Sequence, residues 1–186
     1  MDYPISIQPM TPKLDAIPVY KITCYPLEQR DYKPFAQVRL CMTPQDFWVQ
    51  MWAFEARPRP ESTLKAVFTL PFCQTLLEIT ADAQKNWACA AVSPSGRRQV
   101  SALAHSLDGE DLQGIFWGMS ILLKRSDVEE ALGKGCTEAG QVLLGNVYKL
   151  SDSPEKPHRG SLFSAAFGTG REYALESMAR FPIVSY

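Results

Sequence analysis

The sequence predicts an all-β fold, a two-sheet antiparallel β-sandwich of about ten strands with one short helix. Short segments of alternating apolar and polar residues recur along the chain, and turn-forming residues such as those at 93–96 (SPSG) separate them. Two of these segments flank a four-residue turn, which is typical of a β-hairpin, and only one stretch carries a clear helix signal. Segments of this length and spacing pack most economically as two facing sheets.

The clearest hairpin joins Phe35–Met42 to Phe47–Glu55. Pro44 takes the second position of the intervening turn, where its fixed φ angle suits a type I turn. In the second arm both faces are apolar, so we expect that strand to lie centrally or to be partly covered.

Further strands are expected wherever apolar residues alternate between turn signals. The expected strands are Val19–Cys24, Thr63–Leu70, Thr75–Thr80, Asn86–Val92, Arg98–Ala104, Leu112–Leu123 and Val142–Leu150. Glu172–Met178 suits a last strand, although the same residues would also form a helix.

The one firm helix signal begins at Ser126, which we expect to cap the helix together with Glu129 three residues later. Gly133 and Gly135 should end it. Residues 1–18 contain four prolines and little periodicity, so they predict an extended lead-in that packs along a sheet edge. Residues 19–186 are expected to form a single β-sandwich domain.

Composition excludes several classes of partner. Nineteen basic and twenty acidic residues give a net charge of -1 without long runs of either sign, so neither nucleic acid nor an anionic membrane is an expected partner. Five widely spaced cysteines favour reduced thiols over a disulfide framework or a zinc ribbon. No secretory signal and no apolar run long enough to span a membrane are seen, so we expect a cytoplasmic location.

Motifs for catalysis are missing from the sequence. It contains no GxSxG, HExxH, P-loop or GxGxxG pattern, and neither histidine lies at a metal-ligand spacing. Glu55, Glu78, Glu110 and Asp111 could supply a pair of glycosidase carboxylates, but no motif links them. We therefore assign no catalytic residue and no metal ligand, and expect the protein not to be an enzyme.

Four tryptophans are the candidate binding groups. Trp48 and Trp52 share one face of the second hairpin strand, with Gln50 between them. An exposed indole ring stacks on the flat apolar face of a sugar, whereas a buried one belongs to the core, which is the commoner fate. Arg39 lies opposite this strand in the hairpin, where it could reach a ligand hydroxyl or end in solvent.

The tail of the chain contains the sequence GNVYKLSDSPEKPHRGS at 145–161. By residue type alone, its polar groups suit either a binding edge or a capped strand end. The stretch resembles the NFYKCGD…PHYGSW signature of bacterial proteins with a carbohydrate-binding module family 9-like domain, of the DOMON-like superfamily. Segments that match the same pattern in the same order, between Val19 and Met178, are PFAQVRL at 34–40, EARP at 55–58, LLEIT at 76–80, NWACAAVSPSG at 86–96 and WGMSI at 117–121.

The resemblance implies a β-sandwich that binds a saccharide without catalysis, in an aromatic-lined cleft. The residues expected to bind the ligand are Arg39, Trp52, Glu78, Trp87, Asn146, Lys149 and His158. No cofactor is expected; calcium follows from the resemblance alone, because no acidic cluster marks a calcium loop. The expected partner is a saccharide, and the sequence specifies no protein partner.

Departures from the family pattern support two alternatives. Ala91 and Leu162 stand where the pattern has a polar residue and a tryptophan, which favours a degenerate module that acts as a protein-interaction or structural domain. Some members of the superfamily bind haem through methionine and histidine, so a third hypothesis pairs Met51 with His105 or His158 as axial ligands.

Overall fold

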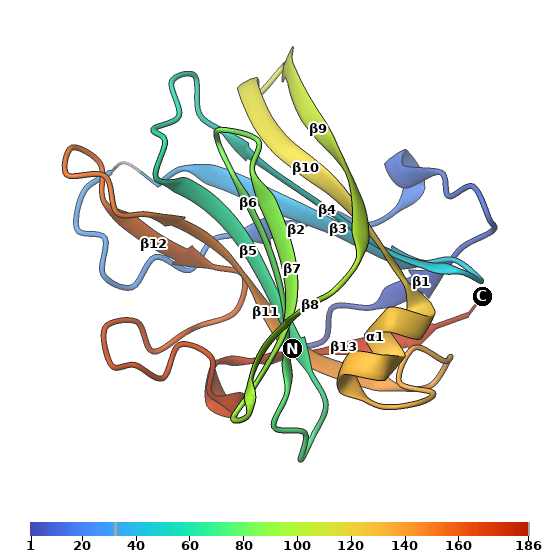
Figure 1. Ribbon diagram of the computed structural model, residues 1–186. Coiled ribbons are helices and arrows are strands. Elements are labelled where there is room, and N and C mark those ends of the chain that lie inside the picture. The colour runs from blue at the N-terminus through green and yellow to red at the C-terminus, as the bar shows by residue number, and fades with distance from the viewer. Residues whose placement is uncertain (32, 186) are drawn as a thin grey trace.

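The computed structural model describes residues 1–31 and 33–185, so Tyr32 and the last residue of the expected 19–186 domain lie outside the described structure. One continuous sheet of thirteen strands dominates the described chain, and it curls into a half-barrel (Figure 1). The strands in the main path follow the order β8-β7-β6-β5-β11-β13-β1-β3-β4-β10-β9, while β12 pairs with β11 and β2 pairs with β3. The expected predominance of strands, with one short α-helix in the described residues, is confirmed.

Two antiparallel arms make up the sheet. The first arm contains β5 (Ser62–Thr69), β6 (Leu76–Asp82), β7 (Trp87–Ser93), β8 (Gly96–Gln99), β11 (Val142–Ser151), β12 (His158–Ser161) and β13 (Ala179–Val184). The second arm contains β2 (Tyr20–Ile22), β3 (Phe35–Met42), β4 (Asp46–Phe54), β9 (Ala102–Asp111) and β10 (Gly114–Lys124).

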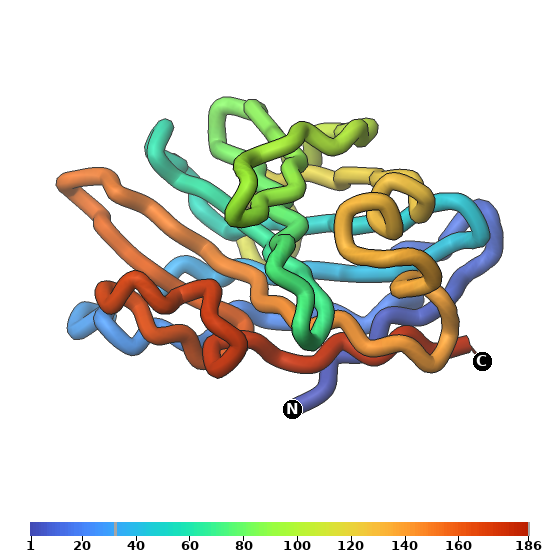
Figure 2. The backbone as a smooth tube through the Cα atoms, turned by 60° about the horizontal axis from the view of Figure 1, so that its bottom comes forward, coloured from blue at the N-terminus to red at the C-terminus, as the bar shows by residue number. Residues whose placement is uncertain are grey.

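The short strand β1 (Ile5–Ile7) joins the two arms, which corrects two expectations. It pairs in parallel with β13 on one side and with β3 on the other. The sheet is therefore mixed and continuous, and the expected two separate antiparallel sheets are not confirmed. The lead-in also does not pack along a sheet edge at this point, because β1 forms ladder bonds on both sides. Figure 2 shows the first and last parts of the chain running side by side at this junction.

The core lies between the two arms. Alternation along each strand turns Val38 of β3 and Met51 of β4 inward, while Leu64 of β5 and Ile79 of β6 point toward them from the first arm. Phe47 and Phe68 meet across the interior at 5.3 Å between ring centroids. The two arms thus face each other as sandwich layers do, although β1 keeps them in one sheet.

The helix α1 (Arg125–Leu132) begins one residue before the expected cap. Lys124 is its N-cap residue, no side chain caps it, and Ser126 lies inside the first turn. The reason is that β10 runs directly into the helix, which leaves no separate position for a capping serine. Glu129 instead accepts a hydrogen bond from Thr137 at 2.5 Å, and the helix ends at Gly133 as predicted.

The expected last strand is also wrong in position. Glu172–Met178 contains a short 3-10 helix at Leu175–Ser177, and the last strand is β13, which follows it. The segment 162–178 covers the outer face of β11, where a second apolar cluster forms. The buried members of this cluster are Val67, Tyr148, Ala165, Phe167 and Met178. The expected Arg98–Ala104 strand is divided between β8 and β9.

Among the described residues, no helix is long and apolar enough to cross a membrane.

Candidate functional site

The outward face of the second arm carries a cleft of about 500 Å³. Because Val38 and Met51 point into the core, strand alternation directs their neighbours to the opposite face. In the hairpin register Gln37 of β3 lies beside Trp52 of β4, and Arg39 lies beside Gln50. These four side chains line the cleft.

Two walls enclose this floor. One wall comes from the segment between β1 and β2 and from β2 itself, with Asp15, Val19 and Lys21. The other comes from the β9–β10 hairpin, with Leu107, Asp111, Gln113 and Phe116. Segments distant in the sequence therefore meet at one concave surface, which is the usual setting of a small-molecule site.

Arg39 is the central polar group of the cleft. Its guanidinium carbon lies 5.0 Å from the centroid of the Trp52 ring, a cation–π contact that holds the planar group in place. Its Nη1 atom lies 3.4 Å from the Gln50 Oε1 acceptor and 3.3 Å from Asp15 Oδ1. Trp52 is only 7% exposed, so its ring orients the guanidinium rather than offering a free stacking face.

A half-buried strip of three phenylalanines borders the cleft. Phe35, Phe54 and Phe116 lie side by side on β3, β4 and β10, with ring centroids 5.3 Å and 5.7 Å apart. Phe116 itself lines the cleft. Aromatic ring faces of this kind can pack against flat apolar groups.

Several polar atoms on the same outward face have no hydrogen-bond partner in the described structure. They are Arg39 Nε, Trp48 Nε1 and Ser120 Oγ, from β3, β4 and β10. Buried polar atoms are nearly always satisfied by protein, water or a bound group. The fourth buried atom without a partner in the described structure, Ser161 Oγ, lies on β12 of the first arm.

Glu78 lies on the outward face of the first arm, not in the cleft. Its carboxylate is 3.3 Å from Lys65 Nζ and 2.9 Å from Arg97 Nη1. The Lys65 ammonium also donates to the Tyr173 hydroxyl at 3.0 Å. This is a second, separate group of polar side chains.

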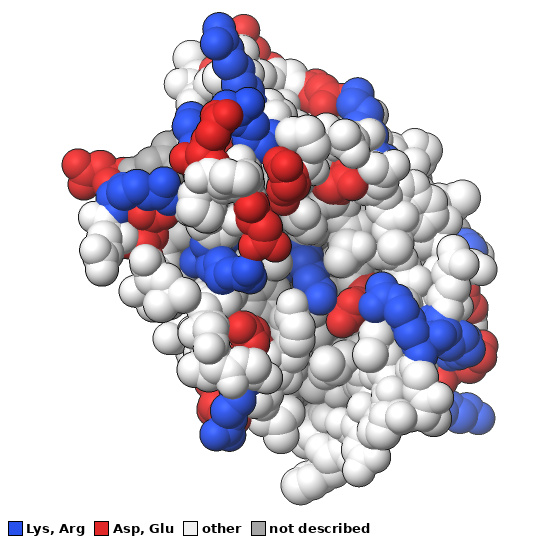
Figure 3. All heavy atoms as spheres, turned by 60° about the vertical axis from the view of Figure 1, so that its left-hand side comes forward, with Lys and Arg blue, Asp and Glu red and all other residues white. Residues whose placement is uncertain are grey.

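On the face shown in Figure 3 acidic and basic residues are interspersed, so neither sign dominates there.

Trp87 and Asn146 are not part of the cleft either. Trp87 is 39% exposed at the start of β7, where it pairs with Ala81 on the first arm. Asn146 is completely buried, and its amide nitrogen donates to the carbonyls of Phe163 and Ser177 at 2.8 Å each. It fastens the covering segment 162–178 to β11, which is a structural role.

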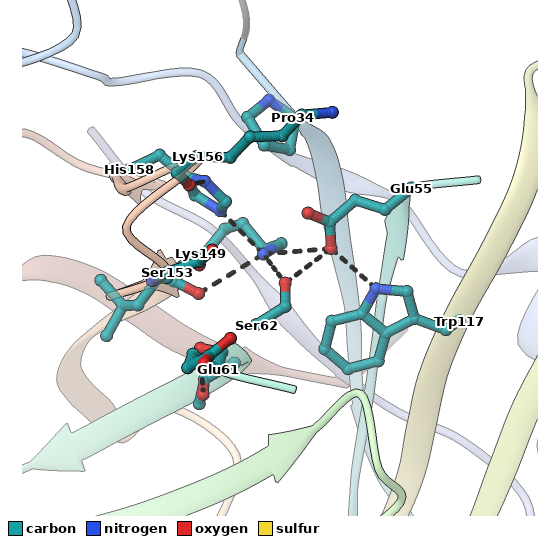
Figure 4. A network of polar contacts seen from close by, with 12 residues as sticks. Pro34, Glu55, Glu61, Ser62, Trp117, Lys149, Ser153, Lys156 and His158 are labelled. Carbon is teal, nitrogen blue, oxygen red and sulfur yellow. Dashed lines mark hydrogen bonds and ion pairs between the residues drawn. The ribbon is translucent and has the colours of Figure 1, made fainter. Parts of the chain in front are cut away.

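Lys149 and His158 belong to a buried polar network that joins the two arms (Figure 4). Lys149 Nζ contacts Ser62 Oγ at 2.5 Å, His158 Nε2 at 2.9 Å and Glu55 Oε2 at 3.2 Å. Glu55 also accepts hydrogen bonds from Ser62 and from Trp117 Nε1, at 2.7 Å and 2.8 Å. Glu55 and Trp117 come from the second arm and the other three residues from the first, so the network ties the arms together.

Burial sets the ionisation of this network. It lowers the pKa of Lys149 to about 8, although Glu55 opposes the shift. It also lowers the pKa of His158 to about 4, with the Lys149 ammonium adding to the effect. Burial opposes ionisation of Glu55, but the Lys149 charge and the hydrogen bonds from Ser62 and Trp117 outweigh it and lower the pKa. At neutral pH the network therefore holds a carboxylate, an ammonium and a neutral imidazole.

The haem hypothesis fails on geometry. Met51 points into the core, while His105 lies on the opposite face of the same arm, since β10 residue Met119 pairs with both Met51 and Ser106. Both ring nitrogens of His158 are already engaged, by Lys149 Nζ and by the Lys156 carbonyl, at 2.9 Å each. Neither histidine can flank one haem together with Met51.

Sequence reasoning found Arg39 and Trp52 but missed other groups of the cleft. Gln37 and Gln50 could have been found, because they share the outward face with Arg39 and Trp52 in the predicted hairpin. Asp15 could not, since it reaches the cleft through the path of the chain between β1 and β2. Asp111 was noted only as one of four carboxylates, and nothing in the sequence places it beside Arg39. Of the seven expected ligand-binding residues, the structure brings only Arg39 and Trp52 together at the cleft.

Comparison with known proteins identifies the fold. No protein-family model matches the chain, and no curated protein matches its sequence. A solved structure of a candidate carbohydrate-binding protein from Bacteroides uniformis ATCC 8492 superimposes with a TM-score of 0.77 and 14% identity, over 98% of each chain.

Two structures of a carbohydrate-binding module of family 9 from Caldicellulosiruptor kristjanssonii are also similar. The complex with glucose matches with a TM-score of 0.64 and 7% identity, over 99% of this chain and 97% of that one. The complex with cellotriose matches with a TM-score of 0.62 and 9% identity, over 99% and 95% of the two chains. The described chain therefore has a carbohydrate-binding module family 9-like fold.

Proposed function

We propose that the protein binds a saccharide in the cleft on the outward face of the second arm, without catalysing a reaction. The observation that carries the proposal is the composition of this cleft: the guanidinium of Arg39 and the amides of Gln37 and Gln50 lie beside Phe116. Sugar recognition needs this combination, because hydroxyl groups pair with planar polar side chains while the apolar ring face lies on an aromatic surface.

The fold supports the proposal. The similar solved structures are a candidate carbohydrate-binding protein and a family 9 module, the latter in complexes with glucose and with cellotriose.

Binding without catalysis is proposed from the chemistry of the lining. The carboxylates at the cleft, Asp15 and Asp111, are both exposed. A general acid in glycoside hydrolysis is typically kept protonated by a buried, apolar setting, which these two residues lack. Among the expected ligand residues, we assign ligand contact to Arg39, with Trp52 beneath it, and scaffold roles to Asn146, Lys149 and His158.

Calorimetric titration with glucose and cellotriose tests the proposal. We expect binding by the wild-type protein and at least a tenfold loss in Arg39→Ala, since charged hydrogen bonds contribute about 1.5–3 kcal/mol. Arg57→Ala is the matched control, because Arg57 is exposed, lies outside the cleft and should leave the affinity unchanged. The proposal fails if no saccharide binds, or if Arg97→Ala beside Glu78 abolishes binding while Arg39→Ala does not.

A further inference from the structure

We infer that the cleft selects saccharides that carry a carboxylate, such as uronic acids, and that Arg39 binds this carboxylate. The inference rests on the saccharide-binding function proposed above and adds the chemical class of the ligand. It follows from the way Asp15 and Arg39 meet at the cleft: the protein's own carboxylate occupies the place that a ligand carboxylate would take.

Asp15 is held weakly in this place. Its Oδ1 atom lies 3.3 Å from Arg39 Nη1, but its side chain is fully exposed, and this is the only polar contact of the Asp15 side chain in the described residues. It belongs to a three-residue 3-10 helix, Leu14–Ala16. None of the three residues of this helix is buried, so packing does not fix Asp15 in place. Exposed ion pairs contribute little stability, and a ligand can displace this one.

Arg39, in contrast, is fixed in position. Its side chain is 20% exposed, lies on the Trp52 ring and contacts Gln50. Its Nε atom has no partner. A guanidinium binds a carboxylate through two parallel N–H bonds, and a group already held by stacking loses little freedom on binding. Arg39 is therefore held with its Nη1 atom directed at Asp15, in the position that a ligand carboxylate would take.

The other charges of the cleft permit an anionic ligand. Lys21 adds a second positive charge on the same wall as Asp15. Asp111 is the acid of the facing wall, and its Oδ1 atom accepts a hydrogen bond from the Gln113 backbone at 2.7 Å within the β9–β10 turn. Once Asp15 has moved aside, two cations and one carboxylate remain around the site.

A matched pair of sugars tests the inference. Affinities for D-glucuronate and D-glucose are measured by titration at low ionic strength, for the wild type and for Asp15→Asn, Asp111→Asn and Arg39→Gln. We expect glucuronate to bind at least tenfold more tightly than glucose. Asp15→Asn should raise the glucuronate affinity about threefold or more and leave the glucose affinity unchanged. Arg39→Gln should abolish the preference for glucuronate.

Asp111→Asn is the control for general charge. It removes one negative charge from the same cleft but touches no atom of Arg39, and its backbone contact can be kept by the asparagine oxygen. If it raises the glucuronate affinity as much as Asp15→Asn does, the effect is one of general charge, and the inference that Asp15 occupies the carboxylate position at Arg39 is wrong. Equal binding of glucose and glucuronate would overturn the carboxylate selectivity and leave saccharide binding intact. Absence of binding by both sugars and by cellotriose would overturn the proposed function itself.

Discussion

At the scale of single residues, Arg39 shows how a side chain gains a role from its neighbours. The sequence places it opposite the second strand of a hairpin. The structure pairs it with Gln50 and adds the indole ring of Trp52 beneath the guanidinium. Stacking removes rotational freedom that a long side chain would otherwise lose on binding. The same contact explains why Trp52, expected to stack on a sugar, is itself almost fully buried.

Gly118 is a residue on which this arrangement depends. A Cβ atom at this position of β10 would lie 2.2 Å from the Met51 carbonyl oxygen and 2.6 Å from Trp52 Cβ. We expect Gly118→Ala to displace Trp52 and to lower the free energy of unfolding by about 1–3 kcal/mol, as overpacked sites do. Urea denaturation checks this. Ser106→Ala, at an exposed position of the neighbouring strand, should stay within about 0.5 kcal/mol of the wild type.

His158 makes stability depend on pH. Its pKa is lowered to about 4 in the folded state, whereas an unfolded chain titrates near 6.5, so between these values the unfolded state binds more protons. Stability is then lost as the pH falls below about 6.5, by about 2 kcal/mol between pH 7 and pH 5. In His158→Gln this part of the pH dependence should disappear, which denaturation at both pH values measures.

His105 is the natural comparison, as the second histidine of the chain and an exposed one. His105→Gln should keep the wild-type difference between pH 7 and pH 5. Because the readout is a slope and not an absolute stability, a general destabilisation of His158→Gln does not obscure it. If His158→Gln keeps the wild-type difference in the free energy of unfolding between pH 7 and pH 5, the buried imidazole is not the group that titrates.

At the scale of elements, local patterns predicted the hairpin β3–β4 with its boundaries correct to one residue. Alternation and a proline turn are contained within twenty residues, so sequence reasoning can find them. The start of α1 and the last strand were misplaced for non-local reasons. β10 continues directly into α1, and β13 forms because β11 and β1 offer pairing edges on either side.

The strand β1 is the element that no local pattern predicts as central. Its residues pair with β13 on one side and with β3 on the other and so join the arms, and Ile5 is fully buried in the core. We expect Ile5→Ala to destabilise the whole domain by about 2–5 kcal/mol, as buried large-to-small changes do. Leu112→Ala, in the exposed β9–β10 turn, should cost less than about 0.5 kcal/mol.

Chemical denaturation of both variants checks this prediction. A small effect of Ile5→Ala, comparable to that of Leu112→Ala, would mean that the side chain of Ile5 does not pack in the core that the two arms share.

At the scale of the whole molecule, two connections hold the two arms together. β1 joins the two arms within the sheet. The buried network of Glu55, Lys149 and His158 connects them across the interior of the half-barrel. The family resemblance predicted the fold but placed Lys149 and His158 at a ligand. The tail motif that carries the resemblance includes these two buried residues and the buried Asn146, which explains how it can mark the fold while its polar side chains lie away from the cleft.

The floor of the cleft could be predicted from the sequence, but its walls could not. The floor follows from strand alternation in one predicted hairpin, whereas the walls depend on where the segment before β2 and the β9–β10 turn come to lie. Asp15 precedes Arg39 by 24 residues in the sequence, and no periodic pattern links the two. The carboxylate that suggests the class of ligand is therefore visible only in three dimensions.

The most direct test of the central claim is the set of tryptophan indole N–H signals in an NMR titration with cellotriose. Four tryptophans in distinct environments report separately: Trp52 lies under Arg39 in the cleft, and Trp117 is bonded to Glu55 in the interior. We expect the Trp52 signal to move with saturable dependence on ligand while the Trp117 signal stays in place. A saturable shift of Trp87 with Trp52 unchanged, or no shift at millimolar ligand, would contradict saccharide binding at this cleft.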